Sequence, residues 1–301
     1  MKIRDRIYVK SLATTLVCSL AMMVPLAGFS GDEIDETLEM PADGLVLVDN
    51  MAGSIEFATW GRSEAQIRGE AGDDVEEVEI SKTSKGIHIR VRNRQGERHI
   101  DGTELHLRIP EAASIEAEGV SADITVSGSQ GKSITLNTVS GDLEVNASPQ
   151  RIELSSVSGD VEFEGSAERS SVETVSGEIT IVGASGEISL NTVSGDVSLE
   201  AGELSRGRFE AVSGDLTLEL SLADGGRLGC DSMSGDVNLR LPASQQARFT
   251  AQSYSGDINS DFGKSIRVSK GPGIMLEHRE GDNGAEIRLE SFSGDISIRS
   301  Q

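Results

Sequence analysis

A row of acidic residues recurs along the chain at a nearly constant spacing, each directly after a glycine. Its members are Asp142, Asp160, Glu178, Asp196, Asp215, Asp236, Asp257 and Asp295. If the units that carry them stack about 4.8 Å apart, each neighbouring pair of charges costs about 0.9 kcal/mol in water. A bridging divalent cation would relieve this repulsion, but an Asp after Gly also commonly bonds to local backbone at a bend. We predict turn chemistry for the row, with weak divalent cation binding as the alternative.

The other reactive side chains form no catalytic pattern. The four histidines, which are His88, His99, His106 and His278, lack the spacing of metal ligands, and we predict that they are solvated surface residues. Serines such as Ser140 recur in the repeat, but no base recurs beside them to activate a nucleophile. We therefore predict no catalytic, cofactor-binding or metal-ligating residues, no cofactor and no enzymatic activity.

The acidic row belongs to a repeat of which residues 134–145, I-T-L-N-T-V-S-G-D-L-E-V, are a clear copy. The glycines of the successive copies are separated by 18, 18, 18, 19, 21, 21 and 38 residues, and we interpret the last step as two periods of 19. These glycines are Gly141, Gly159, Gly177, Gly195, Gly214, Gly235, Gly256 and Gly294. A period near 20 is typical of an array in which each unit buries its apolar face only against its neighbours.

Each copy contains an apolar residue directly before Ser-Gly, which we call the pivot. The pivots are Val139, Val157, Val175, Val193, Val212, Met233, Tyr254 and Phe292, with weaker copies at Val120 and Met51. Alternation places Ile134 and Leu136 on one face. The pivot follows Leu136 by three residues rather than two, so we predict a bulge before it and a buried pivot that shares the inward face with Gly141 and Leu143.

Two architectures fit such units. In a parallel β-helix, two short strands per rung pair with the same strands of the next rung. In a string of hairpins that turn at Ser-Gly, every pivot would lie exposed, and Ser-Gly is a weak two-residue turn. We favour the β-helix because so many exposed apolar residues would need a reason of their own. The predicted fold is all-β, a single-stranded parallel β-helix (β-solenoid) of about 18–21-residue rungs, with right-handedness expected from the bias of parallel crossovers.

The N-terminal part divides into three segments. Residues 1–30 combine a basic start with an uncharged run from Ser11 to Phe29, which predicts a secretory signal peptide, with an uncleaved membrane anchor as the alternative. Residues 31–43 are expected to be an acidic flexible leader. Residues 44–113 contain a first rung and short alternating strands at 65–68, 75–81, 87–91 and 105–109, which we predict to form an N-terminal β cap. Residues 114–301 form the repeat β-helix.

Charge and cysteine content restrict the partners. The chain carries a net charge of -23, and residues 1–30 carry +3, so a chain without them would have a net charge of -26. Such a surface repels nucleic acid and anionic lipid headgroups, which leaves the membrane as a partner only through an uncleaved signal. Without the signal and its Cys18, Cys230 is the single cysteine, and its apolar position predicts a buried, inert thiol.

The sequence also resembles a known family. The segment from Gly53 (G-S-I-E-F-A-T-W-G-R), the strands up to L-H-L-R-I-P at residues 105–110 and the tandem T-V-S-G-D units are similar to the bacterial putative-adhesin family called domain of unknown function 4097. The resemblance covers residues 44–300 and implies an exported, β-helical protein of the periplasm or cell surface without catalytic residues. We therefore expect a non-catalytic, adhesin-like, scaffold or sensor protein that binds an envelope protein or polysaccharide. The alternative is a carbohydrate-active β-helix, which predicts a groove holding two or more carboxylates beside Arg, Tyr or Trp.

Overall fold

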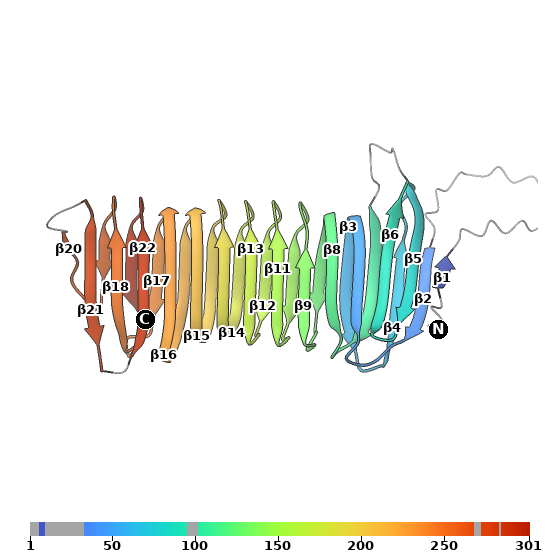
Figure 1. Cartoon of the computed structure of the whole chain (residues 1–301), viewed down its shortest axis with the longest axis horizontal. Coiled ribbons are helices and arrows are strands. Elements are labelled where there is room, and N and C mark those ends of the chain that lie inside the picture. Colours follow the sequence, from blue (N-terminus) through green and yellow to red (C-terminus); the bar gives the residue numbers. More distant parts are fainter. Residues whose placement is uncertain (1–5, 10–32, 95–101, 268–271, 283) are drawn as a thin grey trace, which may run out of the picture.

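The chain folds into one elongated stack of short strands (Figure 1). This computed structural model describes residues 6–9, 33–94, 102–267, 272–282 and 284–301, and the regular structure of these residues is entirely β. In this part of the chain, no helix is long and apolar enough to span a membrane. The strands are β1 (Arg6–Val9), β2 (Glu33–Glu39), β3 (Leu45–Trp60), β4 (Glu64–Glu70), β5 (Val75–Thr83), β6 (Gly86–Asn93), β7 (Thr103–Pro110), β8 (Ser114–Ser127), β9 (Ser133–Asn137), β10 (Leu143–Ala147), β11 (Arg151–Ser156), β12 (Val161–Gly165), β13 (Arg169–Thr174), β14 (Ile179–Thr192), β15 (Val197–Ser213), β16 (Leu216–Ser234), β17 (Val237–Leu241), β18 (Ala247–Ser253), β19 (Ile258–Ser260), β20 (Ile266–Arg267), β21 (Ile274–Glu280), β22 (Ala285–Ser291) and β23 (Ile296–Ser300).

Each rung consists of a strand before the Ser-Gly bend and a strand after it. The strands before the bend form face 1, which contains β9, β11, β13, β18, β22 and the second halves of β14, β15 and β16; the strands after the bend form face 2. Pairing between rungs is parallel, with Ile134 opposite Ile152 on face 1 and Leu143 opposite Val161 on face 2. The predicted parallel β-solenoid is therefore confirmed.

The core lies between the two faces. Along each strand, every second residue is a buried Ile, Leu, Val or Phe, and together these side chains form one continuous apolar cluster. The motif glycines stack in a column at the bend. A Cβ atom built on Gly195 would lie 1.8 Å from the carbonyl oxygen of Gly177 in the neighbouring rung. These positions require glycine because the backbones of adjacent rungs pass too closely for any side chain.

The pivots do not lie in the core, which corrects our prediction. Thr138 is buried, whereas Val139 is 43% exposed, so the alternation continues through residues 137 and 138 and changes phase only at Val139 and Ser140. Thr138 Oγ1 accepts a hydrogen bond from the Gly141 N–H at 3.2 Å and donates one to the Ala122 carbonyl at 3.3 Å. A buried bend leaves polar backbone groups that need partners. A hydroxyl satisfies them and a valine cannot, so the polar residue lies inside and the apolar residue outside.

The rungs do not stack in sequence order at the C-terminal end, and the step of 38 residues before Gly294 is not the two periods of 19 that we infer from the sequence. The last unit of the sequence, β22 and β23, lies between the rung of β16 and β17 and the rung of β18 and β19, and its strands pair in parallel on both sides. The column of glycines has the same order, from Gly235 to Gly294 and then to Gly256. The intervening chain forms no rung, because β21 instead pairs antiparallel with β18 and with β20.

The N-terminal end uses a similar arrangement. Strand β3 lies between β8 on one side and β6 and β7 on the other, and all of these pairings are parallel. Strands β5 and β4 then pair antiparallel with β6 and β7. Four strands therefore lie where the sequence predicts them.

Two other N-terminal predictions have different outcomes. The leader of residues 31–43 is not uniformly flexible, because β2 pairs antiparallel with β4 along its whole length. Along β2, Ile34, Glu36 and Leu38 are the less exposed residues and alternate with exposed ones, which allows a strand despite the acidic composition. Of the predicted signal segment, residues 1–5 and 10–30 lie outside the described residues, and residues 6–9 form β1.

Candidate functional site

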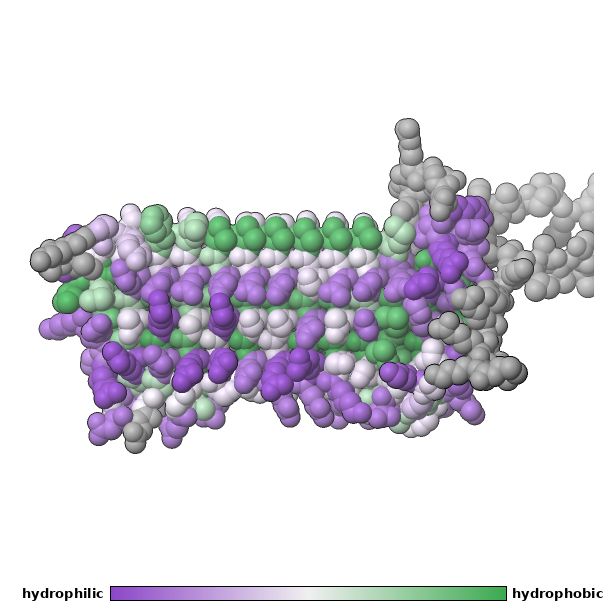
Figure 2. Space-filling view, in the orientation of Figure 1, coloured by the Kyte–Doolittle hydropathy of each residue, from purple (hydrophilic) through white to green (hydrophobic). Residues whose placement is uncertain are grey.

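The exposed pivots form a straight apolar ridge along one long edge of the solenoid. Its ten members are 41% to 61% exposed, and they make up most of the large exposed hydrophobic side chains in the described residues. In stack order they are Met51, Val120, Val139, Val157, Val175, Val193, Val212, Met233, Phe292 and Tyr254. Figure 2 shows much of this pivot ridge as a continuous green stripe. Nine steps of about 4.8 Å give it a length of about 43 Å, and large contiguous apolar surfaces are typical of interaction sites.

The acidic row has a structural role that differs in detail from the local bend chemistry we predict. In seven steps of the stack, one carboxylate oxygen accepts a hydrogen bond from the backbone N–H of the corresponding residue in the next rung, at 2.8 to 3.0 Å. Asp215 Oδ1, for example, accepts the N–H of Asp236. The row therefore joins neighbouring rungs. Within the described residues, no group of three His, Cys, Asp or Glu side chains is arranged to hold a metal ion.

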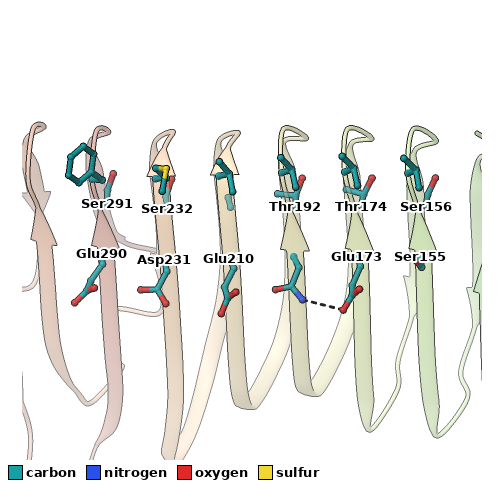
Figure 3. A pocket seen from close by; sticks show the side chains of 18 of the residues that line it. Ser155, Ser156, Glu173, Thr174, Thr192, Glu210, Asp231, Ser232, Glu290 and Ser291 are labelled. Carbon is teal, nitrogen blue, oxygen red and sulfur yellow. Dashed lines mark hydrogen bonds between the residues drawn. The ribbon is translucent and has the colours of Figure 1, made fainter. Parts of the chain in front are cut away.

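A groove of about 710 Å³ runs along face 1 beside the pivot ridge. One side of it is formed by pivots from Val157 to Phe292 and Tyr254, and the other by the residues two positions before each pivot. These second residues are Ser155, Glu173, Asn191, Glu210, Asp231 and Glu290. Figure 3 shows the labelled members of this row projecting from the same side of successive strands. All charged side chains that line the groove are carboxylates.

Three of the groove carboxylates lie on consecutive rungs, and these are Glu210, Asp231 and Glu290. Their surroundings are not equivalent. Glu210 Oε1 accepts a hydrogen bond from Arg208 Nε at 2.7 Å, and Glu290 Oε1 accepts one from Arg288 Nε at 3.0 Å. Asp231 lies between them in the register, and the position two residues before it is Gly229. A Cβ atom built on Gly229 would contact nothing within 4 Å, so the arginine row is interrupted beside Asp231. Partial burial, together with the charges of Glu290 and Glu210, raises the pKa of Asp231.

The substitution Asp231→Asn is expected to raise the melting temperature at pH 7 and to leave it unchanged at pH 3. The folded-state pKa of Asp231 lies above its unfolded-state value, so the protonated form favours folding. Its contribution is fully present below about pH 3.9 and is lost as the pH rises through the folded-state pKa. Thermal unfolding followed by circular dichroism at the two pH values measures the effect. An equal shift at both pH values would contradict this explanation.

The aromatic residues and histidines take other positions. Tyr254 and Phe292 lie at the C-terminal end of the groove with ring centroids 5.8 Å apart.

Three histidines each lie within 3.0 Å of a carboxylate, in the pairs His88 with Asp49, His106 with Glu56 and His278 with Glu280. His88 is partly buried rather than a freely solvated residue. His99 lies outside the described residues.

Cys230 is buried in the core, as predicted. Burial, together with the charge of Asp231, raises the pKa of its thiol far above the ordinary range. A thiol in such surroundings stays protonated and unreactive.

We predicted no site residues from the sequence, so the groove was not anticipated. The pivots and acidic residues were visible as repeat positions, but we placed the pivots inside. Unbroken alternation from Ile134 through Leu136 to Thr138 would have placed Val139 outside. The polar residue that precedes most pivots was the available signal.

Several solved bacterial structures resemble this fold. A protein of Parabacteroides distasonis described as a putative lipid binding protein has 10% identity and a TM-score of 0.51, with 90% of this chain and 99% of that chain covered. A putative adhesin from the same species has 10% identity and a TM-score of 0.47 (89% and 97% covered). A putative adhesin of Bacteroides fragilis has 13% identity and a TM-score of 0.45 (90% and 98% covered). At these identities the likeness concerns the fold alone.

Comparison with curated proteins found no match. The family model described as Toastrack DUF4097 matches residues 51–299, which extend from the middle of β3 to β23. That stretch contains the bend, glycine column and pivot ridge described above. The chain therefore belongs to the Toastrack DUF4097 family.

Proposed function

We propose that this chain is an exported, non-catalytic binding protein of the cell envelope, and that it binds its partner along the pivot ridge and the groove beside it. The observation that carries the proposal is the alignment of ten exposed apolar side chains on consecutive rungs. A surface position in a β-solenoid has no structural need for an apolar residue, and a rigid stack holds these side chains in a fixed line. The basic start and uncharged run within residues 1–30, which predict a secretory signal, support an envelope role.

Site-specific photo-crosslinking tests the binding surface. We expect a photoreactive phenylalanine analogue at Val193, on the ridge, to give crosslinked products of discrete mass in cells. The same analogue at Ser198, which is exposed on face 2 of the same rung, is the matched control and should give none. Equal crosslinking at the two positions, or none at Val193, would refute a binding role for the ridge.

Fractionation tests the location. We expect the mature chain to begin near Gly31 and to be recovered outside the cytoplasm. Full-length protein in the soluble cytosolic fraction would contradict export.

Carbohydrate binding is a second candidate, and the composition of the groove favours it. The groove holds four carboxylates and has the Tyr254 and Phe292 rings beside Glu290, which are the features expected of a sugar-binding face. Affinity electrophoresis through gels that contain envelope polysaccharide tests it. Retardation that disappears in the Tyr254→Ala/Phe292→Ala variant would favour this candidate, and unchanged mobility of the unsubstituted chain would exclude it for the polysaccharides used.

A further inference from the structure

We propose that the occupant of the groove is an amphipathic, basic helix of a partner protein, which lies along the stack with its apolar side on the pivot ridge and its lysine or arginine side chains on the carboxylates. This inference rests on the proposed function and specifies its partner. It is carried by the charge, the period and the length of the groove.

The charge of the groove selects a cationic partner. Glu173, Glu210, Asp231 and Glu290 line it, and no lysine or arginine does. Arg208 and Arg288 lie one row farther from the ridge, where each bonds to one of these carboxylates. No arginine stands on the rung of Asp231, because Gly229 takes that position and has open space beside it, and the charges of Arg208 and Arg288 reach Asp231 only from the neighbouring rungs. A second copy of this chain, which carries a net charge of -23, would bring like charges together.

The period of the groove selects a helix over an extended strand. Rungs repeat about every 4.8 Å, and residues on one side of an α-helix repeat once per turn, about every 5.4 Å. Residues on one side of an extended strand repeat about every 6.8 Å, which does not match. A helix can therefore place side chains on consecutive rungs over several steps. Amphipathic helices commonly bind partner proteins by placing their apolar face in such a groove.

The length of the acidic part of the groove sets the minimum size of the bound helix. From Glu173 to Glu290 the register advances four rungs, through Asn191, Glu210 and Asp231. Four steps of about 4.8 Å give about 19 Å, which corresponds to roughly 13 helical residues. The distance between the ridge and the acidic row is about two residues of a strand, or roughly 7 Å, which is within reach of a lysine side chain from a helix on the ridge.

Three synthetic peptides test the proposal by fluorescence anisotropy with the purified full chain. The first is a Leu/Lys helix with one apolar side, the second has the same pattern with Glu for Lys, and the third is a scramble of the first. We expect the first peptide to bind, with an affinity that falls as salt is raised, and the second not to bind. The scramble should bind at least tenfold more weakly. Equal binding of the first and third peptides would overturn the role of the ridge.

Matched variants localise the binding. We expect Glu210→Gln/Asp231→Asn/Glu290→Gln to weaken binding of the first peptide about tenfold or more, which corresponds to about 1.4 kcal/mol. The control Glu144→Gln/Glu162→Gln/Glu200→Gln makes the same change in net charge on face 2, where all three residues are exposed, and should change affinity less than twofold. Equal losses in the two variants would mean attraction by net charge alone and would overturn the proposal.

Other occupants give different results. Concentration-dependent dimers in sedimentation velocity that disappear in Val175→Thr/Val193→Thr/Val212→Thr would assign the ridge to a second copy. Displacement of the peptide by a neutral hexasaccharide would assign the groove to a glycan. Either result overturns the basic helix. Crosslinking at Val193 in cells combined with no binding of the first peptide would leave the proposed function standing and reject only this class of partner.

Discussion

Deletion of residues 285–301 is expected to open the solenoid from within and to make the Cys230 thiol reactive in the otherwise folded chain. The deleted strands β22 and β23 lie inside the stack, where each pairs with a neighbour on both sides. Cys230 lies opposite Leu289 in this register and is fully buried. Loss of the internal rung therefore leaves an unpaired edge and a cavity beside the thiol, which is among the most destabilising changes for a core.

Thiol labelling in a Cys18→Ser background measures this effect. We expect the complete chain to react only upon unfolding and the deleted chain to react under native conditions. A synthetic peptide of residues 285–301 added in excess is the control, because it should occupy the gap and restore protection. If Cys230 remains protected without the peptide, the rung of β18 and β19 has closed onto β16 and β17, and the internal position of the last unit is not required.

The substitution Gly195→Ala is expected to destabilise the protein by about 3–5 kcal/mol, which is at the upper end for a single methyl group. The added Cβ would lie 1.8 Å from the Gly177 carbonyl oxygen, which belongs to a backbone held by ladders on both sides. Relief of this overlap requires two rungs to separate, which weakens their hydrogen bonds and their apolar contacts.

Gly229→Ala is the matched control, since it adds the same methyl group within the same stack at a position where nothing lies within 4 Å. We expect its effect on the free energy of unfolding to stay within about 0.5 kcal/mol. Urea denaturation of both variants measures the difference. Similar losses in the two variants would show that the glycine column does not limit the distance between rungs.

Much of the fold could be predicted from the sequence because it is repeated. The period of 18 to 21 residues, the inward Ile134 and Leu136 and the glycine column all follow from local patterns that recur in every copy. Our prediction that the pivots are buried was wrong, because hydrophobicity alone favours a buried valine. The bend instead needs a buried hydroxyl that accepts a hydrogen bond from the Gly141 N–H. We chose the β-solenoid over hairpins partly because hairpins expose the pivot. The architecture was correct, and that reason for it was not.

The order of the last rungs could not be predicted, because the units are interchangeable. The unit around Phe292 has buried apolar residues at the same repeat positions as its neighbours, so the pattern alone does not assign its height in the stack. The groove could not be predicted from the sequence for a similar reason. It joins residues from seven rungs whose sequence separations vary, and the opening beside Asp231 depends on the register of Gly229 between Arg208 and Arg288.

The internal position of β3 and of β22 with β23 has a consequence for how such a protein can change in length. Beyond these internal units, antiparallel strands cover both ends of the solenoid, β4 and β5 at one end and β21 at the other, so a repeat added outside them would have no parallel strand to extend. The units between Gly141 and Gly195 are equal in length and contact only their neighbours. Duplication or loss of one of these central units would lengthen or shorten the ridge by about 4.8 Å and leave both ends unchanged. The closed ends thus make the middle of the gene the place where the reach of the binding surface can evolve.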